Sequence, residues 1–363
     1  MSRPANKFIY LYYIAFLMFD SNRITTSLLF FGAAVVIGYI ANKFKPDYKD
    51  SNDYDIIKKY VLNDSPLYGY NRPKLWIHTK YDVNARKWRD FYSRNSTDLN
   101  QPYIHLTIKS IINHCSKDFN ICLIDDETFS KIIPGWDIDV LRAPEPFKSH
   151  YRELGLMNLL YEYGGMIVPN SFICSKNLID FYNDSIEGNK AFVCENICRN
   201  SNQFRQKRKL LFCPDTFFMG APKNNETIGE LVEYLKQHNK YPHFQEEADF
   251  LGYSSHWCMG AIERGQMNLI SGQKIGVKTK KKKTIMLEEL MEENYLDLTP
   301  DCVGVYVPAD DILIRPKYQW FAVMPSRDLL ETRIIAVKYL KASMVDANDE
   351  YHKDTKIRSI VAI

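Results

Sequence analysis

The chain has 363 residues, of which 45% are hydrophobic and 13% aromatic. This is enough apolar material for a substantial core, so a disordered chain is excluded, and one large α/β domain with appendages fits the length. The formal net charge of +3 is near balance and gives no global argument for a nucleic-acid-binding protein.

Two apolar stretches stand near the N-terminus. Residues 24–41 carry no charge and would span about 27 Å as a helix, close to the thickness of a bilayer core, so we predict a transmembrane helix there. Residues 8–19 would span only about 18 Å, and their tyrosines are typical of membrane interfaces. Basic residues flank the main span on both sides, so a single-pass anchor and a hairpin satisfy the positive-inside rule equally well.

Four parts follow from this reading of the chain. Residues 1–45 form the predicted membrane anchor, and 46–72 form a polar stem rich in asparagine, aspartate and tyrosine. Residues 73–344 form the main domain, and 345–363 form a tail that is polar except at its end. The protein is therefore predicted to reside in a membrane, with membrane lipid as one partner.

The main domain opens with alternating strand and helix patterns. A strand led by proline is predicted over 73–78, a helix over 102–115 and a second strand over 119–126. The acidic residues that end the second strand are suited to capping the helix that follows. Further along the chain, helices are predicted in 227–237, 287–294 and 329–343.

The most informative stretch lies between these regions. Apolar residues recur at helical spacing up to Tyr161, and Gly164 and Gly165 then supply a break with positive φ. An apolar strand-like run follows in 166–168 and stops at Pro169, which cannot donate to a sheet ladder. The sequence thus predicts a helix that turns directly into a short buried strand.

This helix, glycine pair and strand resemble the hallmark of the sugar-nucleotide glycosyltransferases with a DXD motif, including the capsular polysaccharide synthesis family. The resemblance is good over residues 73–178 and fades to a faint pattern by about residue 340. It implies a glycosyltransferase A-type fold for 73–344, a mixed, mostly parallel sheet with helices on both faces. A ligand is then expected beyond the carboxyl ends of the strands.

The resemblance also implies a donor site that departs from the family. Its aspartates fall on Pro169, Asn170 and Ser171, which offer no carboxylate to Mn²⁺ or Mg²⁺. We therefore predict no metal site and no cofactor, with a nucleotide sugar as donor. In place of the metal, Lys148, His150 and Arg152 are the predicted cations beside the departing pyrophosphate. The alternative interpretation of these three residues is an exposed basic start of a helix. Together with Asn170 and Ser171 they form the predicted nucleotide-sugar pocket.

Two carboxylates are candidate catalytic residues. The family's Ser-Asp pair, counted back from the glycines, falls on Arg152 and Glu153, and its helical arginine falls on Leu156. The resemblance therefore places Glu153 where an aspartate contacts the donor, and Asp215 where sugar or acceptor is often recognised. A loop carboxylate exposed to solvent is the alternative for Asp215, and core packing is favoured over sugar stacking for His256 and Trp257.

Cysteines and lysines add two smaller observations. Eight cysteines are scattered without the paired spacing of a zinc site, and several lie in apolar stretches where a free cysteine acts as a small hydrophobe. This usage favours a reducing compartment. Two basic clusters, 278–283 and 205–209, are either solvated loops or contacts for phosphate, nucleotide or anionic lipid.

Two functions therefore stand as expectations. The first is a membrane-anchored glycosyltransferase that transfers a sugar to a glycan acceptor through a divergent, metal-independent site. The second is a catalytically inactive protein of the same fold, a structural component with protein partners in a membrane assembly. A chain rich in asparagine, lysine and tyrosine with this anchor also resembles proteins of large DNA viruses. That resemblance implies a minor capsid or inner-membrane role, in a virion membrane or a host endomembrane. No nucleic-acid partner is expected.

Overall fold

The computed structural model describes residues 72–79, 101–144, 146–197, 212–240 and 247–344. The chain divides into two compact units, Met1–Ser51 and Asn52–Ile363, and every described residue belongs to the second. The predicted transmembrane helix 24–41, the segment 8–19, most of the stem and the tail lie outside the described residues, so they stay predictions. Within the described ranges no helix is both long and apolar enough to cross a membrane.

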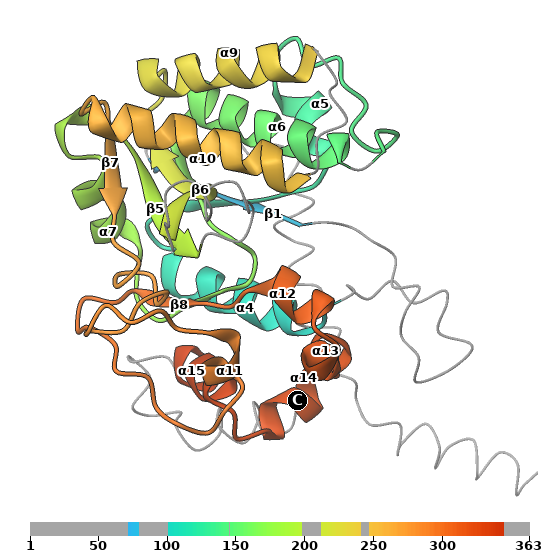
Figure 1. Ribbon diagram of the computed structural model, residues 1–363, viewed down its shortest axis with the longest axis vertical. Helices are drawn as coiled ribbons and strands as arrows, with labels where there is room; N and C mark the ends of the chain where they lie inside the picture. Colours follow the sequence, from blue (N-terminus) through green and yellow to red (C-terminus); the bar gives the residue numbers. More distant parts are fainter. Residues whose placement is uncertain (1–71, 80–100, 145, 198–211, 241–246, 345–363) are drawn as a thin grey trace, which may run out of the picture. The chain divides into compact units, whose positions relative to one another are not determined.

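A six-stranded sheet forms the centre of the domain, in the order β2-β1-β3-β6-β5-β7 (Figure 1). Its strands are β1 (Lys74–His78), β2 (Asn120–Ile124), β3 (Gly165–Ile167), β5 (Ala191–Ile197), β6 (Phe212–Ala221) and β7 (Met267–Ile270). Strand β6 runs antiparallel to both of its neighbours, whereas the other three pairings are parallel. The prediction of a mixed, mostly parallel α/β sheet is confirmed.

Helices cover both faces of this sheet (Figure 1). The helices α6 (Phe147–Tyr163), α9 (Glu226–Lys240) and α10 (Glu247–Glu263) pack on one face, and α4 (Tyr103–Cys115) and α7 (Ile179–Ser185) on the other. Successive side chains of β1 point to opposite faces of the sheet, which explains why the core has two layers. Leu75 and Ile77 belong to one hydrophobic cluster, and Trp76 belongs to the other. Both clusters lie within the second unit, so we expect the fragment 52–363 to fold on its own.

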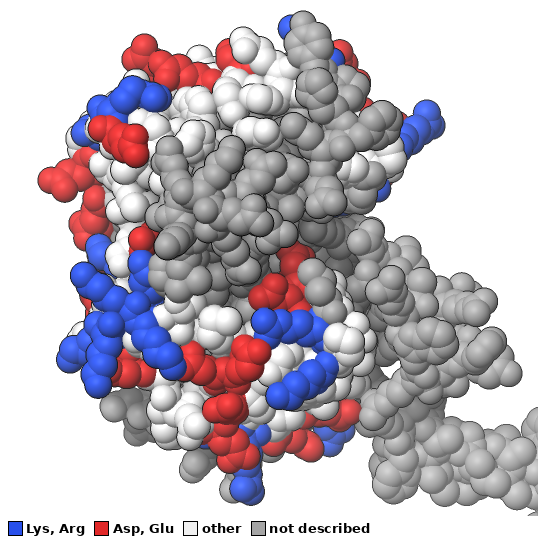
Figure 2. Space-filling view, in the orientation of Figure 1, with Lys and Arg blue, Asp and Glu red and all other residues white. Residues whose placement is uncertain are grey.

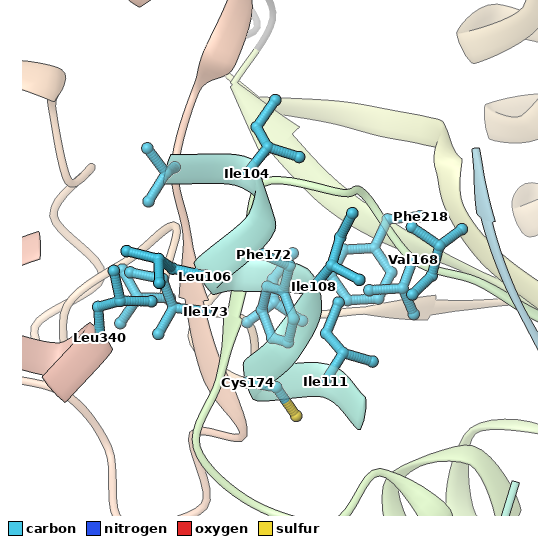
Figure 3. Packing of buried hydrophobic residues seen from close by; sticks show 14 of the residues in the cluster. Ile104, Leu106, Ile108, Ile111, Val168, Phe172, Ile173, Cys174, Phe218 and Leu340 are labelled. Carbon is cyan, nitrogen blue, oxygen red and sulfur yellow. The ribbon is translucent and has the colours of Figure 1, made fainter. Parts of the chain in front are cut away.

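A second, two-stranded sheet lies beside helix α4. Strand β4 (Phe172–Cys174) pairs antiparallel with β8 (Gly304–Tyr306). Figure 3 shows Phe172 beside Ile108 of α4, and Ile173 beside Leu340 of α15 (Ile335–Ser343). The rings of Phe172 and Phe218, on β6, lie 5.2 Å apart between centroids. The chain that leaves the glycine turn is therefore packed into the core within a few residues.

The remaining elements are short. They are α5 (Thr128–Ile132), η2 (Glu187–Asn189), α11 (Leu287–Leu290), α12 (Ala309–Ile314), η3 (Pro316–Tyr318), α13 (Gln319–Val323), α14 (Ser326–Glu331) and α15 (Ile335–Ser343). The predicted helix 329–343 is wrong as a single element, because the backbone is extended at Thr332 and Ile334. The Thr332 hydroxyl donates to the carbonyl of Leu329 at 2.8 Å, and such local bonding by a β-branched residue favours a helix end. The helix predicted over 287–294 is likewise shorter and ends at Leu290.

The glycine turn has the predicted geometry. Helix α6 ends at Tyr163, and Gly164 and Gly165 have φ values of +68° and +99°. The Trp76 indole Nε1 donates to the carbonyl of Gly164 at 3.0 Å, which ties the turn to β1. Strand β3 starts at Gly165 and lies between β1 and β6. The turn thus places the end of β3 beside the end of β1, where the ligand was expected.

No disulfide joins the seven described cysteines to one another, and six of them are buried. The Sγ atoms of Cys115 and Cys174 lie 3.9 Å apart in the core between α4 and β4. Burial raises the pKa of the Cys174 thiol well above its ordinary value. These cysteines therefore act as small core residues, as the sequence indicated for Cys122 and Cys174.

Candidate functional site

The carboxyl ends of the parallel strands β1, β2 and β3 bring three polar side chains together. His78 ends β1, Asp126 follows β2, and Asn170 follows β3. The His78 Nε2 atom lies 3.0 Å from Asp126 Oδ1, and the Asn170 amide donates to the His78 carbonyl at 3.1 Å. This is the edge at which doubly wound α/β proteins bind their ligands.

Arg152 completes this group from helix α6. Its Nε and Nη2 atoms donate to the two carboxylate oxygens of Asp126 at 2.8 Å and 2.7 Å. The two side chains are only 6% and 7% exposed, so the pair is desolvated. Burial alone would raise the pKa of Asp126, but the hydrogen bonds from His78 and Arg152 outweigh it and hold this pKa below its usual range. The charge of Arg152 is therefore balanced inside the protein.

The two other predicted cations lie in the first turn of α6. Lys148 is half-buried and stands one helical turn before Arg152, on the same face of the helix. His150 is buried, with its ring edge-on to Phe147 at 5.9 Å between centroids. Of the three cations predicted for the donor phosphates, Lys148 is thus the one whose side chain is least enclosed.

The residues at the positions where the resemblance would place aspartates are held by backbone contacts. Pro169 and Asn170 are half-buried, and Ser171 is 2% exposed. The Thr107 hydroxyl donates to the Asn170 carbonyl at 2.5 Å, and the Val307 amide donates to the Ser171 carbonyl at 3.3 Å. Across the described ranges, no group of three or more His, Cys, Asp and Glu side chains is arranged to hold a metal ion.

Glu153 faces a different part of the molecule, because consecutive helical residues point about 100° apart. Its carboxylate is wholly buried and accepts hydrogen bonds from Thr216 Oγ1 at 2.5 Å and from Ser254 Oγ at 3.1 Å. Burial raises its pKa to about 7, and the nearby charge of Asp215 adds to the rise, while the two hydroxyl groups oppose it. The structure therefore separates Glu153 from the group around Asp126.

Asp215, the second predicted catalytic carboxylate, lies on β6 and is half-buried. One oxygen accepts from the Asn196 amide at 2.5 Å, and the other accepts from the backbone amide of Phe217 at 3.0 Å. Asp215 thus lies near Glu153, at the border between β5 and β6, and not at the ends of β1, β2 and β3. The two candidate carboxylates share one neighbourhood, and the predicted cations occupy another.

The buried Glu153 predicts a distinctive pH dependence of stability. Since its folded pKa of about 7 exceeds the unfolded value near 4.3, the folded state binds the extra proton between these values. The free energy of unfolding is therefore expected to fall by about 3 kcal/mol as pH rises through 7. Glu153→Gln, which resembles the protonated acid, should remove this slope in urea titrations at pH 5 and pH 8. An unchanged slope in the variant would show that another group titrates.

His78 and Asp126 were not selected as site residues from the sequence, although each is the last residue of a predicted strand. The acidic run after β2 was interpreted as a helix cap. The N-cap residue of α5 is Glu127, which makes no side-chain cap hydrogen bond, but Asp125 Oδ1 accepts from the amide of Thr128, the first residue of the helix, at 3.0 Å. Asp126 instead binds Arg152. Both residues could have been identified from the general rule that α/β proteins bind their ligands beyond the carboxyl ends of parallel strands. Of the two candidates for core packing, Trp257 packs against the core beside Tyr234, as predicted. The same prediction is wrong for His256, which is exposed on the outer side of α10.

Comparison of the chain with models of protein families, with curated proteins and with solved structures finds no match. The function of the chain is therefore inferred from the resemblance in the sequence and from the geometry at the strand ends. At the carboxyl ends of β1, β2 and β3 that geometry consists of the contacts of Asp126 with His78 and Arg152 and of the Asn170 amide, with the half-buried Lys148 one helical turn before Arg152.

Proposed function

We propose that this chain is a membrane-anchored protein of the glycosyltransferase A type. In this proposal it binds a nucleotide sugar beyond β1, β2 and β3 and transfers the sugar to a glycan acceptor without a metal ion. The observation that carries the proposal is the meeting of His78, Asp126 and Asn170 at these three strand ends. The single reversed strand, β6, agrees with the mixed sheet that the resemblance implies.

The donor diphosphate needs positive charge, since negative charge builds on it as the sugar leaves. Arg152 already neutralises Asp126, so its net contribution at the site is small. Lys148 is one turn nearer the start of α6, where the helix dipole also favours an anion. We therefore assign the contact with the diphosphate to Lys148, and the contact with a sugar or ribose hydroxyl to Asn170.

Binding of nucleotide sugars to the fragment 52–363 tests this proposal. Uridine, guanosine, cytidine and adenosine diphosphate sugars are titrated in turn, and the shift in melting temperature is recorded. Lys148→Ala should weaken the binding of the accepted donor by about tenfold or more, because it removes one charge-assisted contact of about 1.5–3 kcal/mol. Lys131→Ala is the matched control, since this exposed lysine of α5 is paired with Glu127. Equal effects of the two changes would refute the assignment.

A specific observation favours a second candidate, the catalytically inactive scaffold. Arg152 and Glu153, which fall on the family's Ser-Asp pair, are both engaged in buried contacts within the protein. Residues that stabilise the fold in this way need no substrate to explain them. If no nucleotide sugar shifts the melting temperature, the scaffold is preferred, and purification of the full chain from its membrane should then recover stoichiometric protein partners.

A further inference from the structure

One basic surface of the domain is not used by the proposed donor site. The lysine hairpin, residues 277–285, follows β7 and contains four consecutive lysines at 280–283. An antiparallel bridge joins Lys278 to Thr284, and the Ile285 amide donates to the Val277 carbonyl at 2.9 Å. Both Val277 and Ile285 are buried in the core. The base of the lysine hairpin is thus fixed to the domain.

The tip of the lysine hairpin is equally well defined. The Lys282 amide donates to the Thr279 carbonyl at 2.8 Å, and the Thr279 amide donates to the Lys283 carbonyl at 2.8 Å. A further bond, from the Lys280 amide to the Asp297 carbonyl at 2.7 Å, attaches the tip to the segment that follows α11. Lys282 has a φ of +61°, which only a constrained turn retains in a lysine. The backbone therefore presents these side chains in a fixed arrangement.

Among the described residues, three of the lysines have no acidic partner. Lys278 pairs with Glu195 at 2.7 Å and Lys283 pairs with Glu289 at 2.6 Å. Lys280, Lys281 and Lys282 are exposed and form no ion pair with any described residue. Figure 2 shows blue side chains gathered below β7, over the loop that follows this strand, and bordered by red acidic ones. Adjacent ammonium groups repel one another, so an anionic surface would stabilise this arrangement.

We propose that the lysine hairpin binds the anionic headgroups of the membrane in which the protein is anchored. The inference rests on the proposed anchor at 24–41, which would keep the domain close to a bilayer. Each lysine near an anionic leaflet contributes about 1 kcal/mol, and tethering raises the effective concentration of the lipid. Contact through the hairpin would fix one side of the domain against the membrane.

Exposed apolar side chains next to the hairpin favour lipid over nucleic acid. Met286, directly after the hairpin, is 40% exposed, and Tyr295, close to the Asp297 contact, is 82% exposed. The Lys338 ammonium lies 4.9 Å from the centre of the Tyr295 ring. Tyrosine with neighbouring lysines is typical of surfaces that lie at the headgroup level of a bilayer.

The test uses the fragment 52–363, so neither the predicted anchor nor a nucleotide sugar contributes to the result. Cosedimentation is measured with phosphatidylcholine vesicles, with and without phosphatidylserine. The fragment should bind only the vesicles with phosphatidylserine, and added salt should release it. The triple change Lys280→Ser, Lys281→Ser, Lys282→Ser should weaken this binding by about 100-fold, the ratio expected for three lysines at an anionic surface.

A matched variant tests whether vesicle binding depends on this particular surface or only on the net charge of the domain. Lys236→Ser, Lys317→Ser and Lys341→Ser remove the same charge from exposed lysines elsewhere on the domain and should change binding by less than about fivefold. Equal losses in the two variants would overturn the proposal, as would equal binding to both kinds of vesicle. Hairpin-dependent binding of duplex DNA or RNA without binding of vesicles would also overturn it. The circular dichroism spectra of both variants should match the wild type, because the exchanged side chains lie at the surface.

Discussion

Gly165→Ala is expected to destabilise the domain more than alanine at any other described glycine. A Cβ atom at Gly165 would lie 2.1 Å from the carbonyl oxygen of Lys74, in the neighbouring strand β1. Neither strand can withdraw, because β3 is also hydrogen-bonded to β6 on its other side. Together with the positive φ of +99°, this contact should cost more than about 4 kcal/mol in free energy of unfolding.

The matched control for this change is Gly135→Ala. Gly135 also has a positive φ, +71°, but nothing lies within 4 Å of the position of its added Cβ atom. This control should lose only about 1–2 kcal/mol, the ordinary cost of a left-handed backbone for alanine. Urea denaturation of both variants measures the difference. If both lose the same stability, the close approach of β1 and β3 at the turn is refuted.

Arg152→Met is expected to cost about 3–5 kcal/mol, because it leaves the buried carboxylate of Asp126 without its bidentate partner. The double change Arg152→Met, Asp126→Asn removes both charges and should recover most of this loss. Arg142→Ala is the control, because its pair with Asp139 is exposed and such pairs contribute about 0–1 kcal/mol.

The same pair predicts sensitivity to acid. Since the pKa of folded Asp126 is depressed, its contribution is present above the unfolded pKa near 3.9 and is lost as pH falls below it. The Arg152→Met variant should therefore differ less from the wild type at pH 3 than at pH 6. A melting temperature of Arg152→Met equal to that of the wild type at both pH values would mean that Arg152 serves a ligand and not the fold.

The sequence predicted the elements that carry strong local signals. Strand β1, helix α4, strand β2 and the turn at Gly164 and Gly165 all lie where periodicity and glycine placed them. Helix α9 was predicted as well, from one apolar stripe. The break between α14 and α15 was missed, because apolar residues continue at helical spacing across an extended Thr332.

The contacts within the candidate site could not be read from the sequence, because they depend on which side of a helix each residue faces. Arg152 and Glu153 are adjacent in the chain, yet one binds Asp126 and the other binds Thr216 and Ser254. The partner of Arg152 is 26 residues away, and Ser254 is 101 residues from Glu153. Such pairings follow from the strand order β2-β1-β3-β6, which no local pattern specifies.

Isothermal titration calorimetry of the fragment 52–363 tests most directly whether this fold binds a nucleotide sugar without a metal ion, as we propose. The panel of nucleotide sugars is titrated once in Mn²⁺ and once in EDTA. We expect one accepted donor with the same dissociation constant in both buffers, because Pro169, Asn170 and Ser171 offer no carboxylate to the ion. A gain in affinity of about tenfold or more with Mn²⁺, or no heat of binding for any donor, would contradict this proposal.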